Sequence, residues 1–446
     1  MSKSGKSKRN GGKKETRVYV IGVGYVGLVT AACLAELGHH VCGVDIDPDK
    51  IELLRKGESP IYEPGLQALL KRNIASGRLI FRVGIDKEIN KYDLAIIAVG
   101  TPEREKDGRA DLFYVGETAK HIAQNVTKKE FIVVGKSTVP IGTAQQIRES
   151  LAHYNKFGTV FHVGSNPETL REGCAVKDFM KPDRIIIGGD EKVQRTLEKL
   201  YFKIKCPKVV TDTKSAEMVK LASNFMLAQR ISTANILSQI CDVTGADIEK
   251  VMEGVGLDNR IGPAFLKAGV GYGGSCFPKD TKSIRSIAEH HRLDISLFDA
   301  VIGINEHQCQ WFMKKIDQMA ILTLKKRNIT VWGTAFKPNT DDTREAPSIR
   351  IIGELLDEKA HVKVYDPVAS LEREFGDSIV HSSDMYESVE GADILLLVTE
   401  WPCFVKADMA KVKSLMTTPK LVDGRNVYDP EAMRALGFEY ASMGRP

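Results

Sequence analysis

Short apolar runs alternate with amphipathic stretches along the first half of the chain. The run at 18–21 predicts a buried strand. A glycine-rich turn and a helix follow it, and Gly38 suits the left-handed position after a helix. A second apolar run at 41–44 ends at Asp45, so the opening unit is strand–helix–strand and begins a parallel sheet. Further buried strands are predicted at 94–99, 131–134 and 185–187. Together these elements predict a doubly wound α/β domain over residues 17–212.

The pattern changes after this domain. Residues 213–243 contain neither glycine nor proline, and their apolar positions recur at helical spacing. This predicts one helix that is long for a globular protein. We expect residues 213–312 to form a central helical region that connects two α/β domains, carries part of an active site and offers a surface for dimerisation.

A second strand–helix–strand order follows the central region. It consists of a strand at 328–332, a helix at 348–356 and a strand at 361–365. A later apolar run at 394–398 predicts another buried strand of the same sheet. Residues 313–446 are therefore predicted to form a second doubly wound domain.

Composition and charge fit a globular protein of several domains. The chain has 446 residues, of which 43% are hydrophobic and 27% charged. The net charge is +5, but residues 1–17 alone carry +6, which leaves −1 for the remainder. We expect residues 1–16 to be a disordered, solvated basic tail that binds neither nucleic acid nor membrane. No signal peptide or apolar run of ~18 residues is visible, and a cytoplasmic location is expected.

The eight cysteines are scattered and include no C-x-x-C pair. This spacing argues against a disulfide framework and against a structural zinc site, so no metal is expected. It also favours a reducing compartment.

The first turn of the chain has the spacing of a dinucleotide site. Gly22, Gly24 and Gly27 follow a strand and open a helix, and Asp45 ends the next strand. In a Rossmann domain, such glycines permit a tight turn, a close approach of the pyrophosphate and close packing of helix on strand. The helix N-terminus offers unpaired N–H groups to the phosphates. Asp45 suits the adenosine ribose hydroxyls and would repel a 2′-phosphate, which favours NAD over NADP.

The segment GVGYGGSCFPKD (269–280) surrounds one cysteine, Cys276, with four glycines and a proline. A lone cysteine is often only a small buried apolar residue. Here it lies in a loop beside Lys279, and nearby cations are expected to lower its pKa and raise its thiolate fraction. Cys276 is therefore a candidate nucleophile.

Several segments, taken in order, resemble the UDP-glucose/GDP-mannose dehydrogenase family. The resemblance covers the chain from Val18 to the C-terminus. One departure is Thr169, where the family usually has a bulky apolar residue. The matching segments are VIGVGYVGLVTA (20–31), IYEPGL (61–66), VGTP (99–102), KSTVP (136–140), NPETLREG (166–173), the helix around Lys220, RIGPAFLKAGVGYGGSCFPKD (260–280), AFKPNTDDTRE (335–345) and DGRNVYDP (423–430).

The resemblance implies a four-electron oxidation of the C6 alcohol of UDP-glucose to a carboxylate, with two NAD reduced in turn. It implies that the Cys276 thiolate attacks the C6 aldehyde, and that the resulting thiohemiacetal is oxidised to a thioester and hydrolysed. Lys220 and Asn224 would stabilise oxyanions at C6. Glu168 would act as general base for the hydrolysis, with Thr138 helping to hold the water. Asp280 would orient a water or pair with Lys220.

The resemblance also assigns the remaining contacts. NAD would be held by Gly22, Gly24, Tyr25, Val26, Gly27, Asp45, Lys50, Thr101, Thr138, Glu172, Lys279 and Arg344. The nucleotide sugar would be held by Glu168, Leu170, Arg171, Glu172, Lys220, Asn224, Arg260, Phe265, Leu266, Lys267, Gly273, Phe336, Lys337 and Arg425. Arg260 would be presented to the site of a neighbouring subunit, which implies a homodimer or a higher homo-oligomer.

Three alternatives remain open at this point. The substrate could be another nucleotide sugar, such as UDP-N-acetylmannosamine, UDP-galactose or GDP-mannose. The chain could instead be a two-electron hydroxyacid or polyol-phosphate dehydrogenase, which needs no cysteine. It could also be an NAD sensor or scaffold without activity, although such a protein has no need of Cys276, Lys220 and Glu168 together.

Overall fold

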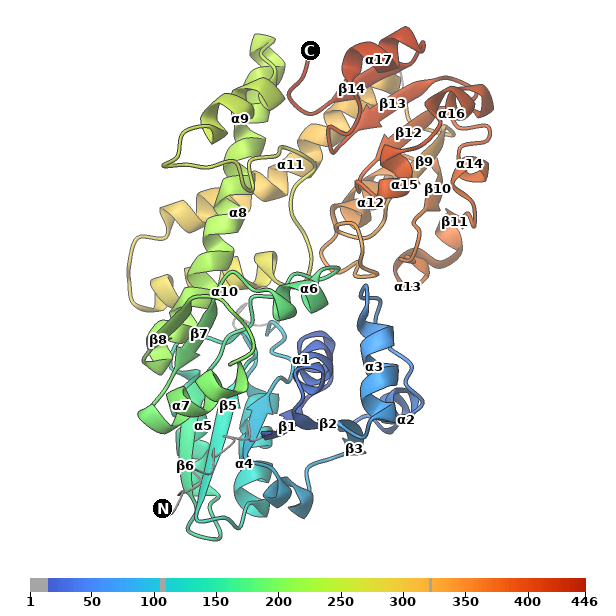
Figure 1. Cartoon of the computed structure of the whole chain (residues 1–446). Coiled ribbons are helices and arrows are strands. Elements are labelled where there is room, and N and C mark those ends of the chain that lie inside the picture. Colours follow the sequence, from blue (N-terminus) through green and yellow to red (C-terminus); the bar gives the residue numbers. More distant parts are fainter. Residues whose placement is uncertain (1–14, 105–109, 321–322) are drawn as a thin grey trace, which may run out of the picture.

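A computed structural model describes residues 15–104, 110–320 and 323–446, so most of the predicted basic tail lies outside the described residues. Two β-sheets with helices on both faces occupy opposite ends of the molecule, and the long helix α8 runs between them (Figure 1). This confirms the predicted fold class of two Rossmann-like domains joined by a central helix. No helix among the described residues is long and apolar enough to span a membrane.

The first sheet has eight strands, and the order across it places β1 beside β4. From one edge to the other the strands are β3 (Leu79–Val83), β2 (His40–Asp45), β1 (Arg17–Ile21), β4 (Leu94–Ile97), β5 (Glu130–Gly135), β6 (Val160–Ser165), β7 (Ile185–Gly188) and β8 (Lys208–Thr211). Neighbouring strands are parallel except β6 and β7, which meet antiparallel at Ser165 and Gly188. The helices of this half are α1 (Tyr25–Glu36), α2 (Pro48–Arg55), α3 (Leu66–Ala75), η1 (Lys87–Lys91), α4 (Phe113–Asn125), α5 (Thr143–His153), α6 (Ala175–Met180) and α7 (Glu191–Leu200).

Strand β1 shows why the sheet is covered on both faces. Val18 and Val20 belong to the apolar cluster on one face, whereas Tyr19 and Ile21 belong to the cluster on the other. Because successive side chains of a strand point to opposite faces, a continuous apolar run predicts a strand buried on both sides. The edge strand β3 was not predicted, because its residues alternate between buried and exposed.

The central region begins with α8 (Thr213–Thr244), which the structure extends one residue past the predicted end. Asp212 caps its N-terminus by accepting a hydrogen bond from Ser215 N, and Gly245 ends it in the left-handed conformation. The helices α9 (Ile248–Gly256), α10 (Phe277–His290) and α11 (Ser296–Ala320) complete the region.

The second sheet has the strand order of a complete Rossmann fold. Its strands are β11 (Val380–His381), β10 (His361–Tyr365), β9 (Asn328–Trp332), β12 (Ile394–Leu397), β13 (Lys420–Asp423) and β14 (Glu439–Ser442), all parallel to their neighbours. Its helices are α12 (Pro347–Asp357), α13 (Glu372–Phe375), η2 (Gly376–Ser378), α14 (Met385–Ser388), α15 (Pro402–Val405), α16 (Met409–Leu415) and α17 (Pro430–Ala435). In both sheets, strands are first added on one side of the first strand (β1 or β9) and then on its other side. Ligands of such folds bind at this switch point.

The core of the second sheet provides a test of these packing relations. Leu396 on β12 is fully buried, so replacing Leu396 with alanine should lower the free energy of unfolding by ~2–5 kcal/mol. All three tryptophans (Trp311, Trp332 and Trp401) lie in or beside this domain, so urea unfolding followed by tryptophan fluorescence measures the change. Val380→Ala, at an exposed position of β11, should change stability by no more than about 0.5 kcal/mol. Equal losses in the two variants would contradict the assignment of Leu396 to the core.

Candidate active site

The glycine turn after β1 has the backbone geometry that the sequence predicts. Gly22 has a φ of +86°, and a Cβ there would lie 2.8 Å from Ala98 O. A Cβ on Gly27 would lie 1.8 Å from Gly22 O, so only glycine lets α1 pack this closely on the turn. Gly24 has open space where its Cβ would stand. The space at Gly24 is therefore available to a ligand.

The first turn of α1 fits an anionic group. Gly24 is the N-cap, and neither a capping side chain nor an acidic residue in the first turn, where Tyr25 and Val26 lie, satisfies the N–H groups. A helix N-terminus left open in this way attracts a pyrophosphate. Asp45 is the last residue of β2, accepts a hydrogen bond from Val23 N and pairs with Lys50 at 3.3 Å. Its carboxylate thus stands beside the glycine turn, as binding of a ribose requires. These residues fit NAD.

Two threonines lie at the ends of neighbouring strands of the same sheet. Thr101 follows β4, Thr138 follows β5, and Thr101 Oγ1 donates a hydrogen bond to Thr138 O at 2.8 Å. The carboxyl ends of β1, β4 and β5 therefore bring the glycine turn and both predicted threonines to one edge of the sheet.

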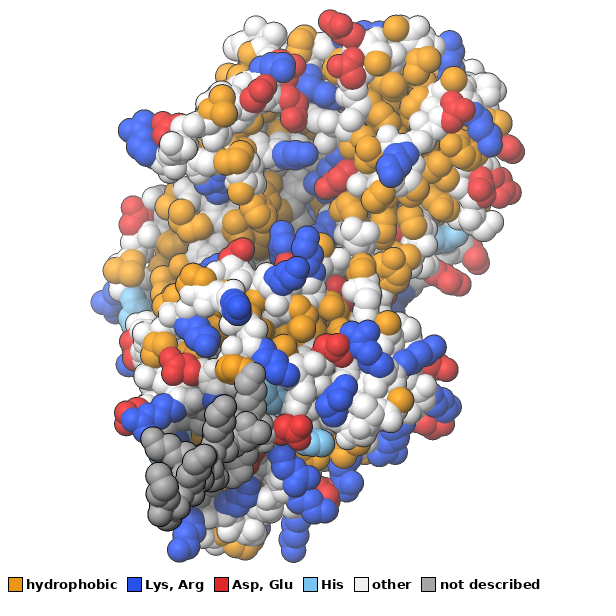
Figure 2. Space-filling view, viewed as in Figure 1, with side chains coloured by type: hydrophobic (Ala, Val, Ile, Leu, Met, Phe, Trp, Pro, Cys, Tyr) orange, Lys and Arg blue, Asp and Glu red, His pale blue; other side chains and the backbone are white. Residues whose placement is uncertain are grey.

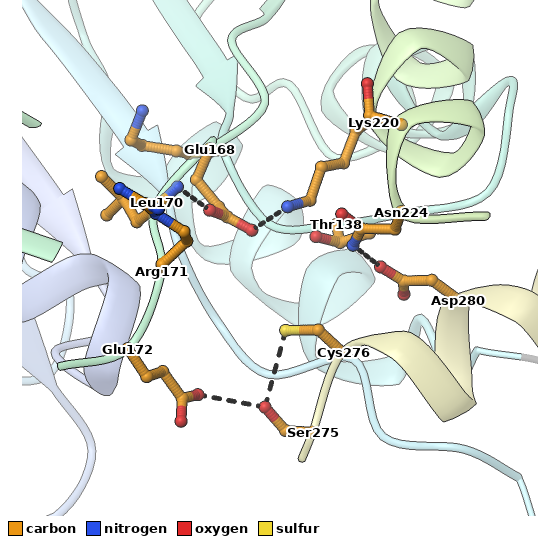
Figure 3. Close-up of polar contacts among 12 residues, drawn as sticks. Thr138, Glu168, Leu170, Arg171, Glu172, Lys220, Asn224, Ser275, Cys276 and Asp280 are labelled. Carbon is orange, nitrogen blue, oxygen red and sulfur yellow. Dashed lines mark hydrogen bonds and ion pairs between the residues drawn. The ribbon is translucent and has the colours of Figure 1, made fainter. Parts of the chain in front are cut away.

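Two polar pairs converge where α8 passes this edge (Figure 3). Lys220 Nζ lies 2.6 Å from Glu168 Oε1, and Leu170 N donates to the other oxygen of Glu168. One turn further along α8, Asn224 Nδ2 donates to Asp280 Oδ2 at 2.6 Å. Of the two roles expected for Asp280, to orient a water or to pair with Lys220, the pairing with Lys220 is wrong for this structure. Lys220 instead pairs with Glu168, while Asp280 pairs with Asn224 and with Lys279.

These four polar side chains are nearly excluded from solvent. Asp280 is fully buried, and Lys220, Asn224 and Glu168 are at most 6% exposed. Burial disfavours the Lys220 ammonium, but the Glu168 carboxylate offsets this and raises the pKa of Lys220 above its usual value. Lys220 therefore stays a cation that can face a developing oxyanion.

The cysteine loop ends at Cys276, which lies at this cluster and is the N-cap residue of α10. The loop packs against the C-terminal domain, where a Cβ on Gly273 would lie 2.1 Å from Glu345 O and one on Gly274 would lie 2.7 Å from the ring of Phe336. Gly274 N also donates to Arg344 O at 2.9 Å. The two glycines therefore let the C-terminal domain hold the thiol in place.

The ionisation of Cys276 differs from the expectation. Burial raises the pKa of the thiol to about 11, and the Glu168 and Asp280 carboxylates add to this effect, whereas Lys220 lowers it. The prediction that neighbouring cations would lower this pKa was therefore wrong for the protein without ligands. The cation of Lys279 is paired with its neighbour Asp280 at 2.6 Å.

Three residues of the C-terminal domain that were expected to hold the UDP part lie close together. The space-filling view shows a hollow between the two halves, with Lys and Arg side chains among those at its rim (Figure 2). Arg425 lies near Phe336, with Arg425 Nη2 3.4 Å from Phe336 O, and Lys337 stands 5.1 Å from the Phe336 ring centroid. Burial lowers the pKa of Lys337. A cationic hollow of this kind suits a diphosphate.

Other predicted residues lie further from the thiol cluster or face solvent. Arg171 forms an ion pair with Asp178, and Leu170 packs against the core of the first domain. Leu266 is buried, Lys267 is exposed and Phe265 has a φ of +60°. The Arg260 side chain is 88% exposed and pairs only with Asp258 among the described residues. Nothing in the single chain brings Arg260 to the thiol.

Two features of the site were missed by the sequence reasoning. Lys136 is buried, its Nζ lies 3.1 Å from Asn166 Oδ1, and burial lowers its pKa to about 8. Ser275 connects Cys276 with Glu172 through two hydrogen bonds. Lys136 lies in KSTVP and Ser275 lies beside Cys276, so both residues belong to segments that the sequence analysis singled out. Their partners Asn166 and Glu172 are remote in sequence.

The glycine turn fits NAD, the second sheet has the strand order of a nucleotide-binding fold, and a thiol lies beside a buried lysine. Together these features define the class of protein as an NAD-dependent dehydrogenase. Models of three domains of one family match the chain. They are the NAD binding domain (residues 16–205), the central domain (214–307) and the UDP binding domain (330–430) of the UDP-glucose/GDP-mannose dehydrogenase family. The chain belongs to this family, and NAD is its cofactor.

Individual relatives match over nearly the whole chain. UDP-glucose 6-dehydrogenase YwqF of Bacillus subtilis is 44% identical over 96% of this chain and 97% of its own length. The UDP-glucose 6-dehydrogenase of Pseudomonas aeruginosa is 43% identical, over 96% and 98%. The solved structure of a UDP-glucose dehydrogenase from Pyrobaculum islandicum superimposes with a TM-score of 0.90 at 38% identity, over 98% of this chain and 99% of that one. No cluster of His, Cys, Asp and Glu suited to a metal occurs among the described residues.

The open space at Gly24 leads to a prediction about the cofactor. In Gly24→Ala the added Cβ meets nothing in the free protein, so the fold should remain intact. It would stand where a pyrophosphate approaches the backbone, so the dissociation constant for NAD should rise at least ~10-fold. Calorimetry of NAD binding and a thermal melt measure the two effects. Gly116→Ala, at another open position, is the control and should bind NAD normally. Normal NAD binding by Gly24→Ala would refute the placement of the cofactor.

Proposed function

We propose that the protein oxidises the C6 alcohol of UDP-glucose to the carboxylate of UDP-glucuronate, in two NAD-dependent steps linked by a thioester at Cys276. The observation that carries this proposal is the convergence of Cys276, Lys220, Asn224 and Glu168 beside the predicted dinucleotide site. The names of the relatives supply the substrate. A two-electron dehydrogenase or an inactive NAD sensor would not need this combination of side chains.

The residues proposed to hold NAD are those of the glycine turn, Asp45 with Lys50, and Thr101 with Thr138. Glu172, Lys279 and Arg344 are proposed as further contacts. NAD, when bound, accepts a hydride from C6 in each oxidation. The role of the protein is to hold C6 beside the thiol and to exclude bulk water from the exchange.

Cys276 is proposed to act after the first oxidation. An aldehyde has no alkoxide from which a hydride can leave, so a nucleophile must first add to the carbonyl carbon. The sulfur of Cys276 forms a bond to C6, and the carbonyl electrons move to the oxygen. Lys220 and Asn224, one turn apart on α8, are placed to stabilise that oxygen, and each donor of this kind commonly contributes about 3 kcal/mol. Loss of the second hydride converts the thiohemiacetal to a thioester.

Glu168 is proposed as the general base for hydrolysis of the thioester. Leu170 N and Lys220 hold its carboxylate on both oxygens, and Thr138 is proposed to hold the attacking water. Removal of a proton from water by a positioned carboxylate accelerates such a step by ~100- to 10,000-fold. The product carboxylate leaves as the thiol of Cys276 is regenerated. Asp280 keeps Asn224 in position through their 2.6 Å hydrogen bond.

The nucleotide sugar is proposed to lie in the hollow between the two sheet-bearing halves. Phe336, Lys337 and Arg425 would contact the UDP part, with Phe265, Leu266, Lys267 and Gly273 along the central region. Accordingly, we propose residues 17–212 as the NAD domain, 213–312 as the central region and 313–446 as the UDP domain. A cytoplasmic location fits the reduced thiol that the chemistry requires.

We further propose that two chains associate through α8. Four apolar side chains on this helix (Met226, Ile236, Ile240 and Val243) are between 37% and 73% exposed. Ile236, Ile240 and Val243 follow one another at spacings of four and three, so they lie on one face of the helix, and exposed apolar faces often mark an interface. Association along α8 would also account for Arg260, whose exposed guanidinium is proposed to reach the neighbouring site.

The stoichiometry of NADH tests the proposed reaction. The protein should form two NADH for each UDP-glucose, and UDP-glucose should be turned over faster than UDP-N-acetylmannosamine, UDP-galactose or GDP-mannose. In Cys276→Ser, steady turnover should fall at least ~1,000-fold because the serine hydroxyl is a far weaker nucleophile, while NAD and UDP-glucose binding change little. Cys403→Ser, at an exposed cysteine, should keep full activity. One NADH per product, or full two-NADH turnover by Cys276→Ser, would refute the thioester route.

The proposed interface is tested by placing a charge on the apolar face of α8. Ile240→Glu would have to bury a carboxylate in the interface, which is costly, so sedimentation should show a shift from dimer toward monomer. Lys199→Glu, at an exposed position of α7, is the control and should sediment like the unmodified protein. An unmodified protein that is monomeric at micromolar concentration would contradict the proposal.

A further inference from the structure

The thiol of Cys276 must lose a proton before it can attack, and its surroundings do not favour the thiolate. Burial and two carboxylates raise its pKa to about 11. At neutral pH the sulfur therefore carries its proton, and a nearby base has to accept it as the bond to carbon forms.

Three carboxylates stand around the thiol, and two of them are already neutralised. Both oxygens of Glu168 are engaged, one by Lys220 and the other by Leu170 N. Both oxygens of Asp280 are likewise engaged, one by Lys279 and the other by Asn224. Neither carboxylate has an oxygen left over to face the thiol, and Glu168 is already the base proposed for the later hydrolysis.

The third carboxylate, that of Glu172, is connected to the thiol. Ser275 Oγ donates a hydrogen bond to Glu172 Oε1 at 3.2 Å, and the same Oγ lies 3.6 Å from Cys276 Sγ. Figure 3 shows the two contacts meeting at the Ser275 hydroxyl, apart from the Lys220–Glu168 pair. Either group can donate in the Ser275–Cys276 contact, which lowers the pKa of the thiol. When the serine hydrogen is directed to the carboxylate, the serine oxygen can accept the S–H of Cys276.

From the contacts of Ser275 with Cys276 and with Glu172 we propose that Ser275 relays the proton of Cys276 to Glu172. As the sulfur bonds to C6, the S–H bond breaks and its proton passes to Ser275 Oγ, while the proton of that hydroxyl passes to Glu172 Oε1. The only electrons that these three residues share with the substrate are the sulfur pair that forms the new bond to C6. When the thioester is hydrolysed, the same path run in reverse returns the proton to the departing sulfur. This role is additional to the nucleotide contacts proposed for Glu172, and it rests on Cys276 being the nucleophile.

The surroundings of Glu172 suit a base that works near neutral pH. Burial, together with the neighbouring Asp342 carboxylate, raises the pKa of Glu172 to about 7, and Arg344 and Lys337 partly oppose this. Arg344 lies closer to Asp342, at 2.7 Å, than to Glu172, at 3.8 Å, and it helps to keep the pKa of Asp342 low. Tyr25 on α1 is also near enough for the Glu172 carboxylate to raise the pKa of its hydroxyl, which is hydrogen-bonded to Glu63. Glu172 Oε2 is buried and accepts no hydrogen bond from a described residue.

Alkylation of Cys276 by iodoacetamide tests the relay in the full chain without substrate or cofactor. The rate is followed from pH 6 to 10 by the mass of the peptide that contains Cys276. Below its pKa Glu172 is protonated and cannot accept a proton, so the rate in the unmodified protein should rise through a midpoint near 7. In Glu172→Gln and in Ser275→Ala this rise should be absent. The rate at pH 7.5 should then be about 100-fold lower, and reactivity should increase only toward the ionisation of the thiol itself.

Further variants separate the relay from simpler effects. Removing the negative charge of Glu172 would by itself favour the thiolate, so a loss of reactivity in Glu172→Gln has the opposite sign to a charge effect. Ser275→Ala leaves Glu172, Asp342 and Arg344 in place and covers the case in which Glu172→Gln misfolds. Ser275→Thr keeps the hydroxyl and should keep the midpoint. Glu289→Gln and Ser296→Ala, both at exposed positions, serve as matched controls and should match the unmodified protein.

The outcomes distinguish the relay from the proposed reaction. An unchanged midpoint in Ser275→Ala, or a rate reduced equally at every pH, would overturn the relay and indicate a packing role. Because alkylation needs neither UDP-glucose nor NAD, that result would leave the two-NADH stoichiometry untouched. Conversely, a failure of the stoichiometry would leave the alkylation profiles intact.

Discussion

The buried ion pair between Lys220 and Glu168 is the contact on which the arrangement of the site depends. It joins α8 to the loop that follows β6, with 2.6 Å between the charged atoms and almost no exposure to solvent. Taking two charges out of water costs several kcal/mol per ion, and the attraction compensates only when the remaining polar atoms are also satisfied. Here Leu170 N provides that additional hydrogen bond. A buried pair of this cost is weak evidence for stability, and it is better explained by the chemistry that its two members are proposed to perform.

Carboxylates at the site also disfavour the Cys276 thiolate that the proposed reaction needs. Glu168 and Asp280 are near enough to Cys276 to disfavour its thiolate, and burial does so more strongly. The three carboxylates differ in their partners: Glu168 and Asp280 each pair with a lysine, whereas Glu172 lies beside Asp342 and has a raised pKa. Different environments of chemically similar groups are the usual way in which acid and base roles are divided at a site.

The position of the thiol also depends on both domains. The cysteine loop leaves the central region and packs against Phe336 and Glu345 of the C-terminal domain, while Glu172 and Glu168 come from the N-terminal domain. The site is therefore assembled at the junction of three parts of the chain. A change in the relative position of the two sheets would alter the contact between Ser275 and Glu172 directly.

Local patterns in the sequence were sufficient for the sheets, the long helix and the glycine turn, because each depends on residues a few positions apart. The runs at 18–21 and 328–332 specify buried strands, and the absence of glycine and proline over 213–243 specifies α8. The resemblance to a known family then indicated which polar residues to expect at the site. The partners of those residues were not accessible in this way. That Lys220 pairs with Glu168 and not with Asp280 depends on side chains more than 50 positions apart, and the rise in the pKa of Cys276 depends mainly on burial. Ion pairing and desolvation are set by distances in the folded chain, and these distances exist only once the two domains and α8 have packed together.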